Sequence, residues 1–208
     1  MGNITLIDIV GSYIIAALLF MIMLKMDGNL SYANFTAIND LTVQTNIVTA
    51  ARIIEEDFRK IGYCAVPANF PDPSKGITSA TLHSISFVTD IPDATHPYGD
   101  GILDTISYTV GSKTTLTQTK NPNDFLLYRK VSNPTSSKTT TMSLGLTRFD
   151  FTFYNAQEDS LSFPIAVPSA IYEMRLTMLL QSPFAYDTTY SYSYWRQMRL
   201  ASRNLKAR

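Results

Sequence analysis

The sequence carries no net charge and very little cysteine. Its 17 basic and 17 acidic residues cancel over 208 residues, so the chain lacks the positive field that draws proteins to nucleic acid, and no nucleic-acid binding is expected. A single cysteine, Cys64, excludes an intramolecular disulfide and a Cys-rich zinc site. Only 16% of residues are charged while 45% are hydrophobic, a balance that excludes long disorder and supplies a sizeable core.

The motifs of common enzymes are also missing. The chain has no Gly-x-Ser-x-Gly, no His-Glu-x-x-His, no phosphate-binding glycine loop and no dinucleotide fingerprint. Its two histidines, His83 and His96, have no partner at metal-ligand spacing. Cys64 follows a helix C-terminus, where the helix dipole disfavours a thiolate. We therefore predict a protein that is not an enzyme and that needs no cofactor.

One long run without charge stands near the N-terminus. Residues Ile9 to Leu24 are uncharged, and a helix begun at Ile4 would rise about 31 Å, which just crosses a bilayer core. No basic residue precedes the run and no small-x-small cleavage site follows Leu24, so residues 1–28 are predicted to be a retained transmembrane anchor rather than a cleaved signal. A buried soluble helix is the alternative. By the positive-inside rule, Lys25, just after the run, would place the residues that follow the anchor on the cytoplasmic side. That orientation is opposite to the one expected for an exported C-terminal domain.

Residues 29–63 continue with a helical period. The apolar face is predicted to hold Leu41, Gln44, Val48, Ala51, Ile54, Phe58 and Ile61. Gly28 and Asn29 are a weak point between the two halves, and Gly62, followed by prolines, should end the helix. Glu55, Glu56 and Asp57 stand three or four residues from Arg52 or Arg59, which predicts a solvated, internally paired face.

Residues 64–208 have the pattern of an antiparallel sheet. After Pro73 the period becomes two, and strands are predicted over 82–89, 102–110, 125–131, 146–154 and 171–180. Phe149, Phe151 and Phe153 fall on one strand face, and the Ser/Thr-rich stretch from Ser132 to Ser143 is expected to be a mobile hairpin or loop. The predicted fold class is α+β: a long N-terminal helix, transmembrane in its first half, packed on an antiparallel sheet.

Three groups of side chains suggest weaker hypotheses. The first is four carboxylates that suit calcium but are also ordinary in turns, Asp90, Asp93, Asp100 and Asp104. The second is an aromatic series that either packs on the helix or forms an adhesive or subunit contact, Tyr190, Tyr192, Tyr194 and Trp195. The third is a basic C-terminus that meets lipid, an acidic partner or only water, Arg196, Arg199, Arg203, Lys206 and Arg208.

The opening Ile-Thr-Leu-Ile-Asp, residues 4–8, followed by the apolar run and a long amphipathic helix, resembles the N-terminus of type IV pilins and type II secretion pseudopilins. Their motif reads Phe-Thr-Leu-Ile-Glu, so Asp8 stands where the family has glutamate. Residues 51–63 (ARIIEEDFRKIGY), 100–108 (DGILDTISY) and 199–205 (RLASRNL) are similar to segments of minor pilins and pseudopilins.

The resemblance implies roles for two groups of residues. Gly2, Asn3 and Ile4 stand at the processing site: a prepilin peptidase cuts after Gly2 or after Asn3, or the chain is inserted unprocessed, or its true start lies upstream. Asp8 would pair with the freed amine of a neighbouring subunit, whereas the plainer alternative is that its carboxylate reaches the lipid headgroups. Gly11 and Ser12 would allow close helix approach in a bundle.

The expected function is that of a non-enzymatic structural subunit of a type IV pilus or type II secretion pseudopilus. The resemblance implies a single-pass protein of the bacterial inner membrane with an extracytoplasmic C-terminal domain. Its implied partners are other pilin or pseudopilin subunits, an inner-membrane assembly platform and the lipid bilayer. The alternative is a membrane-tethered extracytoplasmic domain that binds glycan or protein.

Overall fold

A computed structural model describes residues 2–116, 119–183, 185–186, 189–190, 194–201 and 203–206. Side chains are described from residue 6 onward, but not those of residues 185–198, 203 and 206. The chain divides into two compact units, Met1–Leu41 and Thr42–Arg208, and each is considered by itself.

The first unit is helical throughout its described residues. Helix α1 spans Gly2–Arg59, and residues up to Leu41 belong to this unit. The helix continues through Gly28 and Asn29, where we expected a weak point, because a single glycine inside a helix costs only about 1 kcal/mol.

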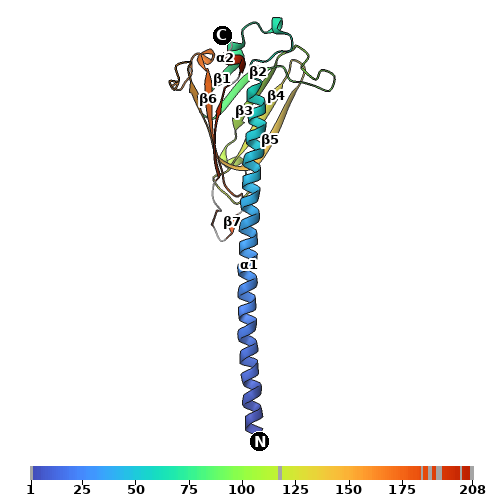
Figure 1. The fold of residues 1–208 in the computed structure, drawn as a ribbon, viewed down its shortest axis with the longest axis vertical. Helices are drawn as coiled ribbons and strands as arrows, with labels where there is room; N and C mark the ends of the chain where they lie inside the picture. The colour runs from blue at the N-terminus through green and yellow to red at the C-terminus, as the bar shows by residue number, and fades with distance from the viewer. Residues whose placement is uncertain are drawn as a thin grey trace. The chain divides into compact units, whose positions relative to one another are not determined.

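The second unit contains the last part of α1 and an antiparallel sheet that confirms the predicted α+β class (Figure 1). The strand order is β1-β2-β3-β4-β5-β6-β9, with every neighbouring pair antiparallel. The strands are β1 (Ile77–Ala80), β2 (Ser84–Thr89), β3 (Asp104–Val110), β4 (Phe125–Ser132), β5 (Ser137–Tyr154), β6 (Glu173–Leu180) and β9 (Tyr194–Leu200). A separate two-stranded ribbon is formed by β7 (Ala185–Tyr186) and β8 (Thr189–Tyr190).

Short helices connect these strands and close the chain. They are the 3₁₀ turns η1 (Pro67–Asn69), η2 (Pro73–Gly76), η3 (Lys113–Thr115) and η4 (Pro168–Ala170), and the final helix α2 (Arg203–Lys206). Gly62, at φ +72°, follows the end of α1 as the sequence predicted, because a left-handed residue there is nearly free of strain only for glycine.

Strand β5 pairs with a different neighbouring strand along each half of its length. Its first half pairs with β4 and its second half with β6, and the register shifts between them near Gly145. Gly145 has φ +74°, and a Cβ there would lie 2.1 Å from the carbonyl oxygen of Gln181. Only glycine fits this bend, which turns the second half of β5 away from β4.

The hairpin or loop expected over Ser132–Ser143 is a β-hairpin, and most of its residues belong to strand β5. Only residues 133–136 form the turn between β4 and β5. The side-chain oxygen of Asn133 accepts hydrogen bonds from the backbone N–H groups of Thr135 and Ser136, at 3.1 and 2.6 Å. Serine and threonine suggested a loop by composition, but threonine also favours strands, and pairing with β4 decides the outcome.

The core lies between one stripe of α1 and the inner face of the sheet. The helix contributes Val43, Ile47, Ala51, Ile54, Phe58 and Ile61, and the sheet contributes Phe87, Tyr108, Leu127 and the predicted trio Phe149, Phe151 and Phe153. Leu41, Gln44 and Val48 were expected on this stripe, but all three are exposed. At about 100° per residue, Leu41 and Val48 lie about 140° and 120° around the helix from Ile54, near the centre of the stripe, and Gln44 lies about 80° away at its margin. Val43 and Ile47 occupy the stripe instead.

Candidate membrane anchor and assembly segment

The first unit exposes an apolar helix surface. Helix α1 contains a segment long and apolar enough to cross a bilayer, and none of that segment is buried within the protein. Large side chains along it, such as Leu19, Phe20 and Met23, are more than half exposed. A continuous exposed apolar surface of this kind is suited to contact with lipid or with other helices.

Asp8, Gly11 and Ser12 lie on one face of this helix. Gly11 and Ser12 follow Asp8 by three and four residues, and the hydroxyl of Ser12 donates a hydrogen bond to the backbone carbonyl of Asp8 at 2.8 Å. A Cβ added at Gly11 would have no atom within 4 Å, so the backbone is open to another helix at this point. A shallow hollow on the helix surface is lined by Asp8, Ser12 and their neighbours Ile9, Tyr13 and Ala16.

The predicted processing residues lie at the start of the same helix. The backbones of Gly2, Asn3 and Ile4 are helical, and their side chains lie outside the described part of the chain.

The second unit contains a buried polar contact that sequence reasoning missed. Asp57 of α1 receives hydrogen bonds from Nε and Nη2 of Arg129 at 2.6 and 2.9 Å, and from the hydroxyl of Tyr108 at 2.5 Å. Asp57 was expected on the solvated face, but its side chain is only 10% exposed. Burial, reinforced by the adjacent carboxylate, raises the pKa of Tyr108, and the hydrogen bonds to Asp57 raise the pKa of Arg129.

A sequence signal for this contact existed. Phe125, Leu127, Arg129 and Val131 alternate along β4, so a lone arginine stands on the apolar face of its strand. A charge in that position needs a buried partner of opposite sign. The rest of the predicted helix pairing is confirmed, because Arg52 pairs with Glu56 at 3.0 Å and Arg59 with Glu55 at 2.6 Å on the helix surface.

The four aspartates considered for calcium are held mainly by backbone groups. Asp90, fully buried, accepts hydrogen bonds from the N–H groups of Ala65, Asp100 and Gly101 at 2.9 to 3.1 Å. Asp104 accepts one from Ile91 at 2.9 Å, and its pKa is raised, chiefly by burial.

The carboxylate of Asp100 accepts a hydrogen bond from the N–H of Ile102 at 2.8 Å, and Asp93 closes an exposed turn. The Asp93 carboxylate accepts hydrogen bonds from Thr95 and His96, and these bonds, the Thr95 hydroxyl first, lower its pKa. Within the described ranges, no three His, Cys, Asp or Glu side chains come together in a way that could hold a metal ion. The aspartates therefore act in this structure as caps for loops.

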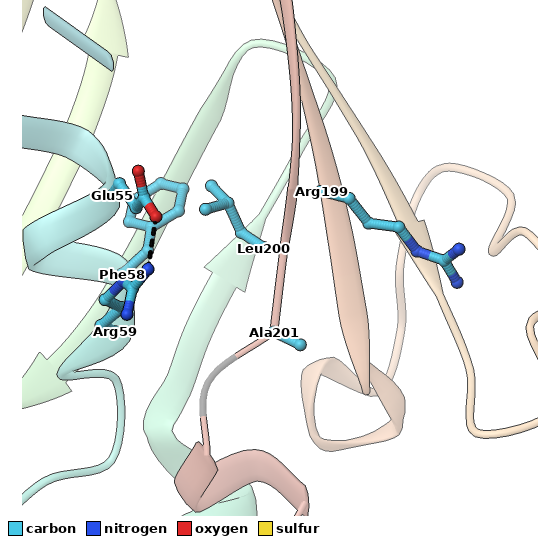
Figure 2. Close-up of a pocket in the computed structure, with 6 residues that line it drawn as sticks. All are labelled: Glu55, Phe58, Arg59, Arg199, Leu200 and Ala201. Atoms are coloured by element: carbon cyan, nitrogen blue, oxygen red, sulfur yellow. Dashed lines mark hydrogen bonds and ion pairs between the residues drawn. The ribbon is translucent and has the colours of Figure 1, made fainter. Parts of the chain in front are cut away.

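A crevice of about 330 Å³ lies beside the C-terminal turn of α1 (Figure 2). Leu200 of β9 extends toward Phe58, while Glu55 and Arg59 pair with each other at its rim. Arg199 extends the other way, toward Glu173 and Glu158, and the hydrogen bonds to Glu173 raise its pKa. The charged side chains that line the crevice, Glu55, Arg59 and Arg199, are thus all in ion pairs within the chain.

Two of the weaker hypotheses fall largely outside the described residues. This applies to the side chains of the aromatic series, Tyr190, Tyr192, Tyr194 and Trp195, and to those of Arg196, Arg203, Lys206 and Arg208. Arg199 is the described member of the basic group, and it lies in the ion pairs above.

Comparison with known proteins gives one kind of match. No protein-family model matches the chain, and no curated protein sequence matches it. Among solved structures, the chain is similar to a type IV-like pilin, TTHA1219 from Thermus thermophilus, with 9% sequence identity and a TM-score of 0.47. The similarity covers 78% of this chain and 97% of that one, and it is a loose likeness of fold.

Proposed function

We propose that this protein is a non-enzymatic structural subunit of a pilus or pseudopilus, anchored in a membrane by its N-terminal helix. The observation that carries the proposal is the fully exposed apolar surface of α1 with a single carboxylate, Asp8, near its start. A surface of this kind is stable in lipid, and it is equally stable in a bundle of similar helices. Assembly would then move the helix from one apolar environment to the other.

Asp8 gives the bundle its specificity in this proposal. A carboxylate inside a membrane helix costs about 2.5 to 3.5 kcal/mol on insertion scales, so it is retained where it has a partner. The resemblance of residues 4–8 to pilins makes the N-terminal amine of a neighbouring subunit that partner, after processing at Gly2, Asn3 or Ile4. Gly11 and Ser12, on the same face, let the two helices approach closely.

The proposed setting follows from the same resemblance. The chain spans a bacterial inner membrane once, its C-terminal domain is extracytoplasmic, and other pilin-like subunits and an assembly platform are its partners. Residues 1–28 act as the anchor, residues 29–63 as the amphipathic helix, and residues 64–208 as the sheet domain.

The substitution Asp8→Ala tests the proposal. It should leave membrane insertion intact, because it removes an insertion cost, while reducing co-purification with partner subunits by about tenfold, since a lost charge contact is worth at least about 1.4 kcal/mol. Asp27→Ala, at the other end of the apolar run, is the matched control. It should change neither membrane insertion nor co-purification with partner subunits. Equal recovery of partners with Asp8→Ala and wild-type protein would show that Asp8 only reaches the headgroups.

The mature N-terminus provides a second test. Cleavage after Asn3 would place Asp8 fifth, as in the family, whereas cleavage after Gly2 would place it sixth and rotate it by about 100° relative to the amine. Mass spectrometry of the N-terminal peptide from membranes distinguishes the two. A peptide that retains Met1 or Gly2 would mean that assembly through the amine contact must be abandoned.

A further inference from the structure

A cleft opens in the second unit where β4 and β5 separate. Their paired register ends at Phe125 and Leu146, just beyond the bend at Gly145. The space left between them has a volume of about 440 Å³, which is in the range of small-molecule binding sites. Its apolar lining comes from Val110, Phe125 and Phe149.

The polar lining of this cleft is predominantly basic. It contains Lys113, Arg148 and His83 and one carboxylate, Asp150. Asp150 lies 3.0 Å from Nδ1 of His83 and 2.5 Å from Nε of Arg148, and the lining also includes the hydroxyls of Ser112 and Thr147. Lys113 makes no hydrogen bond or ion pair within the described part of the chain. Even with His83 neutral, two fixed positive charges face one negative charge, so the cleft favours an anionic group.

A second feature lies on the face of the sheet opposite to the core. Side chains alternate along a strand, so the neighbours of buried Ile85, Ile106 and Leu127 point away from α1. The strand register places them in three cross-strand rows: Ser84-Thr109-Tyr128-Thr141, Ser86-Ser107-Lys130-Thr139 and Val88-Thr105-Ser132-Ser137. Every position in these rows except Val88 and Lys130 carries a hydroxyl group.

These hydroxyl rows form a regular array. Neighbouring strands lie about 4.8 Å apart, and successive residues on one face lie about 6.8 Å apart. Within the described residues, the hydroxyls of Ser107, Thr109, Thr139 and Thr141 have no hydrogen-bond partner. The three rows contain one charge, Lys130, and one aliphatic side chain, Val88, so they suit neither a highly charged partner nor an apolar one. Donor and acceptor hydroxyls at short intervals match a polyol.

The cleft and the hydroxyl rows meet at Gly111. Gly111 lines the cleft, and a Cβ there would lie 3.0 Å from the ring of Tyr128, which belongs to the first row. A ligand that fills the cleft can therefore continue onto the rows. It would bring a carboxylate to Lys113 and Arg148 and hydroxyl groups to the sheet face.

We propose that the second unit, Thr42–Arg208, binds an acidic oligosaccharide, a chain of sugars that includes a uronic acid. The sugar carboxylate binds Lys113 and Arg148 in the cleft, with Asp150 holding the Arg148 guanidinium in position. Neighbouring sugars lie over Tyr128 and exchange hydrogen bonds with Thr109 and Thr141. The proposal does not depend on filament assembly, because all of these residues belong to the second unit.

Calorimetric titration of the full-length protein in detergent with trigalacturonate tests the proposal. Maltotriose, which lacks the carboxylates, and inorganic phosphate, which lacks the sugar, are the comparison ligands. Trigalacturonate should bind at least tenfold more tightly than either one. Lys113→Gln should weaken its binding about tenfold, because one charged hydrogen bond is lost. Lys138→Gln is the matched control, since Lys138 lies on β5 in register with inward-facing Val131 and outside the hydroxyl rows, and should change binding less than twofold.

The hydroxyl rows are tested with Thr109→Val, which keeps the shape of the side chain and removes only the hydroxyl. It should weaken trigalacturonate binding about threefold and leave phosphate binding unchanged. Equal losses of trigalacturonate affinity in Lys113→Gln and Lys138→Gln would show that the ligand is held by general charge attraction. That result would overturn the proposed site. Phosphate binding as tight as trigalacturonate, or no effect of Thr109→Val, would overturn the sugar assignment. No binding of trigalacturonate at millimolar concentration would overturn the proposal altogether.

Discussion

Replacing Arg129 with methionine should strongly destabilise the second unit, Thr42–Arg208. The side chains of Asp57 and Arg129 are 10% and 23% exposed, so solvent cannot replace the guanidinium once it is removed. Removing one partner of a buried ion pair costs about 3 to 5 kcal/mol, and the partial exposure of Arg129 places the expected loss near 3 kcal/mol. At about 2 to 4 °C per kcal/mol for a domain of this size, the midpoint of thermal unfolding should fall by roughly 6 to 12 °C.

Circular dichroism of residues 29–208 during thermal and urea unfolding would measure this loss. Arg52→Met is the matched control: the Arg52–Glu56 pair lies on the same helix, but its side chains are 80% and 60% exposed, so the loss should stay below about 1 kcal/mol. Adding Asp57→Leu to Arg129→Met should restore much of the stability, because it removes the stranded carboxylate. Equal effects of Arg129→Met and Arg52→Met would refute the expectation that the buried ion pair stabilises the fold far more than the exposed one.

Three further predictions concern the same domain. Residues 29–208 should be soluble and folded without the anchor, since the core-forming stripe of α1 begins at Val43, and aggregation of this fragment in the absence of detergent would count against that division. Gly145→Ala should lower the free energy of unfolding by about 2 kcal/mol or more, because the added Cβ meets the carbonyl of Gln181 at positive φ; unchanged urea unfolding would contradict this. Asp124→Asn should raise the unfolding midpoint at pH 7, because burial raises the pKa of this carboxyl and one of its oxygens has no partner among the described residues. A raised folded-state pKa contributes stability below the unfolded pKa that is lost as the pH rises, so the gain should shrink in acid, and a gain that grows in acid would disprove the assignment.

The sequence predicts the parts of this fold that follow from periodicity. The apolar run, the helix end at Gly62 and the alternating Phe149, Phe151 and Phe153 each depend on local spacing, and the structure agrees at all three. The helix stripe was less well predicted, because Leu41 and Val48 are apolar but lie more than about 100° around the helix from its centre at Ile54, and both are exposed. A series of three- and four-residue steps drifts around the helix, so spacing alone does not show which apolar residues share the buried stripe.

Long-range contacts were not predictable in the same way. Asp57 has basic neighbours at helical spacing, so local rules assign it to a surface pair, and its partner Arg129 is 72 positions away. The strand over 137–143 depends on pairing with β4, which overrides its loop-like composition. The cleft beside Arg148 depends on the bend at Gly145, and the hydroxyl rows depend on strand register, neither of which periodicity specifies.

Photocrosslinking within the membrane helix tests the central claim most directly. A benzophenone side chain would replace Ile15, two turns from Asp8 on the same face, or Ala17, at a similar depth on the opposite face. The account predicts that Ile15 crosslinks to a second copy or to a chain identified by mass spectrometry as having a similar apolar N-terminal helix, that Ala17 does so much less, and that Asp8→Ala abolishes the difference. Equal yields at the two positions, or crosslinks to lipid alone, would contradict assembly through the face that carries Asp8.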